Sequence, residues 1–150
     1  MTTLNTLASE RAAVVAVVDP DANSAAAYTS GYVSMSTFRQ VMAVVQTGIL
    51  GSSATVDFKL VQATDSSGTS SKDITGKAVT QLVKASNDDD QAIINCSSDE
   101  LDVANGFDYV AMVMTVGTAT SDCSAIMLGL QPRYAPANDN DLASVVEIVS

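Results

Sequence analysis

The segment at positions 31–63 constrains the fold most strongly, because it contains the clearest strand alternation in the chain. Val56, Phe58 and Leu60 occupy every second position there, and the intervening residues are Asp57, Lys59 and the less polar Val61. A period of two is expected where one face of a β-strand meets a core. Residues 56–61 are therefore predicted to form a strand with one buried face.

Residues 39–47 form the second apolar run of this segment. Val41, Ala43 and Val45 would share one face of a strand, and the other face would carry Met42 and Val44. Such a pattern predicts a strand buried on both sides, with a helix as the rival interpretation. The glycines and serines of positions 48–54 supply turn residues for an antiparallel connection and would stop a helix.

Further strands are predicted from shorter apolar or alternating runs, at positions 14–18, 91–96, 107–116 and 123–130. In the last of these, Ile126, Leu128 and Leu130 share one face. Asp19-Pro20 is expected to end the first strand. A helix of one or two turns is predicted through Ala104, because the serines and acidic residues of positions 97–100 precede Leu101 and Asn105-Gly106 follows.

Two segments lack a clear pattern. The polar stretch 64–78, TDSSGTSSKDITGKA, is predicted to be a loop, and Ile74, Val79, Leu82 and Val83 then provide a weaker strand or a short helical turn. Positions 142–149, LASVVEIV, are predicted to form a terminal strand or an arm. These segments interrupt a series of strands of similar length with little helix between them.

This series predicts an all-β fold: a single-domain antiparallel β-sandwich, jelly-roll-like, with little helix and extended termini. A chain of 150 residues has room for one domain. We expect a flexible N-terminal arm at 1–12, the sandwich at 13–134 and a C-terminal extension at 135–150. The strand spacing does not determine the topology.

The charge distribution excludes several partners. The net charge is -10, and the seven basic residues are dispersed, so the chain lacks the basic patch that nucleic-acid binding requires. No apolar run approaches the roughly 18 to 20 residues that span a bilayer, and no basic region precedes the N-terminal apolar run. No nucleic acid, membrane or signal peptide is therefore expected.

The inventory of reactive side chains argues against an enzyme. The chain has no histidine, and it contains no serine-hydrolase, zinc-protease or phosphate-binding loop motif. The acidic residues at 99–102 fit favourable charges at a helix start better than a catalytic pair. The acidic clusters 88–90 and 139–141 lack the ligand spacing of a calcium loop, so we expect no metal or other cofactor.

Cys96 and Cys123 are the only cysteines. They are too few for a disulfide scaffold, and without histidine they make a poor zinc site. Two buried free thiols are the favoured interpretation, since unpaired cysteine behaves as a small apolar residue. A disulfide formed under oxidising conditions is the alternative.

Candidate partner contacts lie in the predicted loops and beside the predicted strand ends. Arg39 and Arg133 each sit next to a strand, where a guanidinium could bind a partner's carboxylate in a bidentate manner. The others lie in the serine-rich segment or near the termini, which fit a self-contained core poorly. The candidate contacts are Arg11, Arg39, Lys72, Lys77, Arg133 and Tyr134.

The order of several segments resembles a family of small proteins encoded among the head and structural genes of tailed bacteriophages and prophages. The most distinctive pieces are QATDSSGT, KDITGKA, DELDVANGF and PRYAPANDNDLA, and the resemblance extends over nearly the whole chain from about Ala12. It implies a non-enzymatic capsid decoration or cement protein. Such a protein would form homo-oligomers on the shell of an HK97-fold major capsid protein, at the capsid surface of a virion assembled in the host cytoplasm.

Two other functions remain open at this point. A head-completion or tail-tube protein would also be small, rich in β-strands and oligomeric. A carbohydrate-binding module would use the same sandwich, but it would need an aromatic platform. The chain has no tryptophan, and the tyrosines that could serve are Tyr28, Tyr32 and Tyr134.

Overall fold

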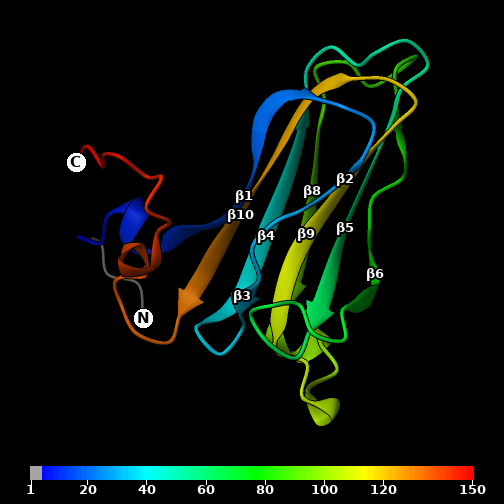
Figure 1. Cartoon of the computed structure of the whole chain (residues 1–150). Helices are drawn as coiled ribbons and strands as arrows, with labels where there is room; N and C mark the ends of the chain where they lie inside the picture. The colour runs from blue at the N-terminus through cyan, green and yellow to red at the C-terminus, as the bar shows by residue number, and fades with distance from the viewer. Residues whose placement is uncertain (1–4) are drawn as a thin grey trace.

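The computed structural model describes residues 5–150 and consists of two facing antiparallel β-sheets (Figure 1). Sheet A has the order β1 (Ala12–Asn23), β10 (Ser121–Pro132), β4 (Phe38–Thr47) and β8 (Gln91–Ser97). Sheet B has the order β2 (Ala27–Thr29), β9 (Tyr109–Gly117), β5 (Thr55–Ala63) and β6 (Lys72–Ala78). Two short strands complete sheet B: β3 (Val33–Ser34) pairs with β9, and β7 (Leu82–Val83) pairs with β5. The predicted antiparallel sandwich is confirmed.

The strand order is that of a jelly roll. When β2 with β3, and β6 with β7, are each taken as one position, the chain has eight strand positions. It passes from sheet A to sheet B, back to A and again to B, stays in B for β6, and then runs through β8, β9 and β10 in the order A, B, A. Two sheets of four positions connected in this way form the double-sheet jelly roll.

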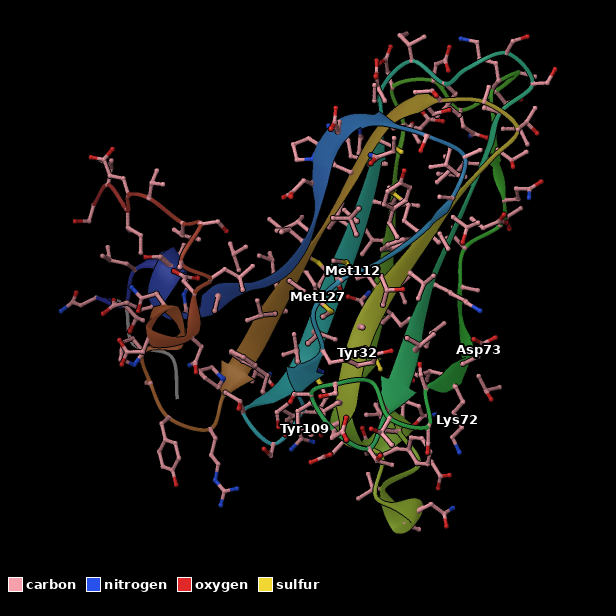
Figure 2. The ribbon with its side chains drawn as sticks, in the orientation of Figure 1. Tyr32, Lys72, Asp73, Tyr109, Met112 and Met127 are labelled. Atoms are coloured by element: carbon pink, nitrogen blue, oxygen red, sulfur yellow. The ribbon has the colours of Figure 1, made fainter. Side chains whose placement is uncertain are left out.

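The core lies between the sheets and contains the residues whose alternation predicted strand β5. Val56, Phe58 and Leu60 are each at most 1% exposed. Met112 on β9 and Met127 on β10 are fully buried in the same cluster, between the two sheets (Figure 2). Methionine suits this place because its flexible side chain fills irregular gaps between sheets.

Strand β1 does not end where the sequence predicted. It continues through Asp19 and Pro20 to Asn23, and its register against β10 shifts between Val18 and Asp21. β1 lies at the edge of sheet A, so the missing N–H of Pro20 removes no bond that the sheet requires. A bulge at an edge strand accommodates the proline.

The prediction of a loop throughout 64–78 is wrong for its second half, which forms the edge strand β6. Only Ile74 of this strand is buried, so the alternation that marks a strand is nearly absent from its sequence. The first half is a turn as predicted. The carboxylate of Asp65 accepts hydrogen bonds from the N–H groups of Ser67 (2.9 Å) and Thr69 (3.1 Å), and these bonds lower the pKa of Asp65.

Positions 48–54 connect the two sheets rather than two paired strands, because β4 belongs to sheet A and β5 to sheet B. The predicted helix after β8 is replaced by two 3-10 helices, Ser98–Glu100 and Val103–Asn105. Gly106 follows in the left-handed conformation (φ 84°), which glycine adopts without steric cost. The prediction of a terminating Asn-Gly is therefore right, although the helix is not an α-helix.

The terminal segments contain two more 3-10 helices, Ala8–Glu10 and Ala137–Asn140. Residues 142–149 form no strand, so of the two predictions the arm describes them better. The first four residues of the predicted N-terminal arm lie outside the described residues. Within 5–150, no helix is both long and apolar enough to cross a membrane.

Candidate interaction surface

The six predicted contact residues do not gather on one surface. Arg11 and Arg39 are exposed, the first directly after the N-terminal 3-10 helix and the second at the start of β4. Lys72 and Lys77 lie on β6, and Arg133 and Tyr134 follow β10. Each pair therefore has to be considered in its own surroundings.

Lys72 and Lys77 make ion pairs within the chain. The ammonium of Lys72 lies 2.6 Å from Asp102 and 4.0 Å from the ring centroid of Phe107, while that of Lys77 lies 2.7 Å from Glu100. Hydrogen bonds from these lysines are the main cause that lowers the pKa of both carboxyl groups. The two lysines fasten β6 to the segment that follows β8, and Figure 2 shows Lys72 at that end of the sandwich.

Gln62 also joins β6 to the segment that follows β8, and no sequence pattern predicted this role. Its side chain is buried although it is polar. Its Oε1 accepts the N–H of Asp102 (2.8 Å), and its Nε2 donates to the carbonyl of Asp73 (3.3 Å). A buried amide satisfied on both sides links β5, β6 and the segment after β8. Lone glutamines in strands carry no pattern from which such a link could be predicted.

Arg133 and Tyr134 come together beside a surface hollow of about 440 Å³. Tyr134 is 77% exposed, and the guanidinium of Arg133 lies 5.9 Å from the centroid of its ring. Ser36, Thr37, Asp139 and Asn140 form the rest of the wall. Of the six predicted residues, this pair presents the most accessible side chains for a partner.

The tyrosines do not form an aromatic platform. The hydroxyl of Tyr28 donates to the carbonyl of Ser24 (3.0 Å), and that of Tyr32 donates to Ser71 (2.9 Å). The ring of Tyr32 also lies against Gly68, where a Cβ would come within 2.6 Å of it. Tyr134 alone among the three is freely exposed, so flat stacking of several sugar rings has no surface here.

Residues of both acidic clusters make hydrogen bonds or ion pairs within the chain. Asp88 accepts the N–H of Leu50 (2.9 Å) and pairs with Lys84, and these contacts lower its pKa. Asp141 accepts the N–H of Val14 (2.7 Å), which attaches the C-terminal segment to strand β1. Within the described part of the chain no group of potential ligands could hold a metal ion.

Cys96 and Cys123 are buried and free, as the favoured interpretation predicted. Cys96 is opposite Val41 and Cys123 is opposite Thr47, so the two are separated by six residues along β4, or about 20 Å. A disulfide needs Cα atoms within about 7 Å. Burial raises the pKa of the Cys123 thiol and raises that of Cys96 to about 11, so neither is a reactive thiolate near neutral pH.

The outer face of sheet A is the largest feature that the sequence did not predict. Residues directly opposite one another in neighbouring strands lie on the same face of the sheet. The pairing register therefore places four rows of side chains on this outer face. The rows are Ala12–Leu130–Gln40–Ser97, Val14–Leu128–Met42–Asn95, Val17–Ile126–Val44–Ile93 and Ser124–Gln46–Gln91. We call these residues the open face.

The open face is apolar at its centre and carries no charge at any position of the four rows. Ile93 is 55% exposed and Ile126 is 36% exposed, and the other apolar members are partly exposed. Glutamine, serine and asparagine form much of its rim. Charges begin at one end of the open face, where Asp122 of β10 lies opposite Ala22 and Asp19 borders a hollow beside Val17. An apolar centre depleted of charge inside a polar rim is the usual composition of a protein interface.

The open face also corrects two predictions. Residues 39–47 are not buried on both sides: Val41, Ala43 and Val45 are in the core, but Met42 and Val44 face outward. Ile126, Leu128 and Leu130 do share one face, but it is the outer one. Both strands are apolar on both faces. This pattern predicts burial within a single chain, but it also fits a strand with one face left open on the surface.

The C-terminal segment runs along one rim of the open face. The N–H of Leu142 donates to the carbonyl of Val14 on the free edge of β1 (2.9 Å). Ser144 then borders a hollow of about 280 Å³ whose walls include Val17, Val44 and Ile126. Beyond it, Val146 is 95% exposed and Val149 is 86% exposed. The segment that follows the rim therefore ends in uncovered apolar side chains.

Comparison with known proteins gives only distant similarities. No protein-family model and no curated protein sequence matches the chain. The xylan-binding CBM22-1 domain of Paenibacillus barcinonensis Xyn10C has 13% identity and a TM-score of 0.42, over 81% of this chain and 88% of that one. A chain of the Cowpea Mosaic Virus empty virus-like particle has 14% identity and a TM-score of 0.36, over 77% and 58%.

A third similar structure, from the disulfide-linked pili of Bacillus endospore appendages, has 17% identity and a TM-score of 0.30, over 87% of this chain and 99% of that one. Similarities of this size indicate no shared function. The open face therefore has to be interpreted from its own chemistry.

Proposed function

We propose that the protein is a non-enzymatic structural protein of a tailed-phage virion, a decoration or cement protein bound to the shell of an HK97-fold major capsid protein. The observation that carries the proposal is the open face of sheet A. An uncharged apolar face of this kind is stabilised when other protein covers it. The resemblance to proteins encoded among phage head genes gives the class of assembly in which that covering would occur.

The remaining surface fits the same role. Its net charge of -10 disfavours contact with packaged DNA, so a position on the outside of the shell or within its wall is favoured. Repeated copies on one shell would add modest contacts into strong total binding. Arg133 and Tyr134, with exposed side chains beside the hollow, are the candidate contacts with the shell.

The number of copies in purified particles tests the proposal. We expect the protein in particles of the phage or induced prophage that encodes it, in numbers comparable with the major capsid protein, as measured by quantitative mass spectrometry. A few copies per particle would indicate the head-completion alternative instead. Presence in isolated tails but not in heads would indicate a tail-tube role, and absence from particles would overturn the proposal.

A rebinding experiment locates the shell contact. Heads freed of the protein are mixed with wild-type chain, with Arg133→Ala/Tyr134→Ala, and with Arg11→Ala as a control at an exposed arginine that does not line the hollow. We expect weaker binding for the double variant only, measured by co-sedimentation. Equal binding of all three proteins would remove these two residues from the contact.

A further inference from the structure

We propose that the open face of sheet A is the contact between two copies of this chain, which pack face to face about a two-fold axis. The inference deepens the proposed function, because it names the partner of the surface on which that function rests. It assigns the open face to self-association and leaves the shell to other surfaces of the resulting dimer.

The distribution of charge favours a second copy. Two chains with a net charge of -10 repel one another wherever their acidic surfaces meet. Within the four rows of the open face this local repulsion is absent, because none of them contains an acidic or basic residue, and the nearest acids on this face, Asp19 and Asp122, lie at one end of it. A two-fold contact brings the same surface of both copies together, so a surface of one charge sign would oppose itself.

The rim of the open face is chemically self-complementary. Gln40, Gln46, Gln91 and Asn95 carry amides that donate and accept hydrogen bonds, and the hydroxyl of Ser97 does the same. Such groups can bond to their own kind across a two-fold axis. The charged groups that border this rim are the Lys77–Glu100 ion pair, which is already neutralised within the chain, and the acids Asp19 and Asp122 at one end.

The area of the open face is sufficient for a dimer. The four strands span about 14 Å between their axes, and the four rows span about 20 Å along the strands. With half a spacing added on each side, the face covers about 19 Å by about 27 Å, or about 500 Å² for each copy. Two copies would bury about 1,000 Å², which reaches the size of a specific interface.

The C-terminal segment extends this area. It lies at the β1 rim, where Ser144 borders the hollow that Val17 and Ile126 line. A second sheet packed about 10 Å above the open face would reach this rim. Val146 and Val149, which the chain itself leaves exposed, would then have apolar surface of the partner copy within reach.

Sedimentation equilibrium of the full chain tests the inference. We compare wild type with Ile93→Glu and Ile49→Glu at neutral pH. Ile93 lies on the open face and Ile49 on the connection between β4 and β5, and their exposed fractions are 55% and 56%. The two variants therefore receive the same charge at equally exposed isoleucines.

We expect a wild-type dimer, an unchanged dimer for Ile49→Glu, and a dissociation constant at least ~30-fold higher for Ile93→Glu. Circular dichroism of both variants checks that they are folded. A second substitution, Ile126→Glu on the central strand β10, should act in the same direction. A wild-type chain that is monomeric at about 100 µM, or equal dimerisation of the Ile93 and Ile49 variants, would overturn the inference.

Binding to heads, measured on the same proteins, separates this inference from the proposed function. A monomeric wild type that still binds heads would remove the dimer and leave the decoration role. A wild-type dimer that fails to bind heads, and is absent from particles, would leave the dimer and remove the decoration role.

Discussion

On β10, core-facing and outward-facing residues alternate, and both faces carry apolar residues. Ala125 and Gly129 point into the sandwich, whereas Ile126 and Leu128 lie on the open face. The Phe38 ring fills the space above Gly129, where a Cβ would lie within 2.7 Å of it. Interiors are close-packed, so the volume left by neighbouring side chains decides what fits.

Replacing Gly129 by alanine should therefore destabilise the protein by about 1–3 kcal/mol, because the added methyl group overpacks a ring that is 2% exposed. Gly31→Ala is the matched control, since a Cβ at Gly31 meets nothing within 4 Å. We expect that control to change the free energy of unfolding by less than about 0.5 kcal/mol. Urea denaturation of both variants measures the difference, and equal midpoints would contradict it.

The same packing explains why the sequence predicted the strand at 123–130 but not its orientation. Both faces of this strand are largely apolar, so polarity does not distinguish core from surface. Which face of the strand is buried can be decided only when the opposite sheet is known. Phe38 and Gly129 are far apart in the sequence, and no motif links them. They meet only through the pairing of β4 with β10.

At the level of elements, β6 is held by tertiary contacts more than by its own sequence. Ile74 is its only buried residue, while Lys72 and Lys77 pair with acidic residues on the segment after β8. Exposed ion pairs of this kind contribute little individually. The buried amide of Gln62 is the more demanding link, because its partners lose their hydrogen bonds if it is removed.

Gln62→Leu should lower the free energy of unfolding by about 1–3 kcal/mol, because the N–H of Asp102 and the carbonyl of Asp73 lose their partner. Gln81→Leu provides the control. Gln81 also bonds to an aspartate, Asp57, but the pair is exposed and water can replace it. Urea denaturation should show a clear loss for the first variant and less than about 0.5 kcal/mol for the second. Similar values for the two would show that burial of Gln62 has no special importance.

At the scale of the whole molecule, the sequence was sufficient for the class of fold. The alternation at Val56, Phe58 and Leu60 predicted β5 and its buried face, and the polar turns predicted a series of short strands. The pairing of the strands could not be predicted from the sequence, because paired residues on β1 and β10 are about a hundred positions apart. The open face could not be predicted either, since it exists only once β1, β10, β4 and β8 lie side by side.

Salt should strengthen the proposed dimer. Each copy carries a net charge of -10, and the repulsion between two copies extends over about 30 Å at 0.01 M salt but only about 8 Å at 0.15 M. The four rows of the open face contain no charged residue, so salt would not weaken an attraction between them. We expect the dissociation constant to fall by about tenfold or more over this range. Sedimentation measurements that show weaker association in salt would instead indicate a contact made by opposite charges.

The strand order has a consequence for synthesis on the ribosome. β9 lies between β2 and β5, and β10 lies between β1 and β4, so the last two strands to be translated are inner strands of both sheets. Until about residue 132 has left the exit tunnel, the earlier strands have no neighbours with which to complete either sheet. β4 with β8 and β5 with β6 can pair earlier, but neither sheet can be completed until β9 and β10 have emerged, so we expect the sandwich to close late in synthesis.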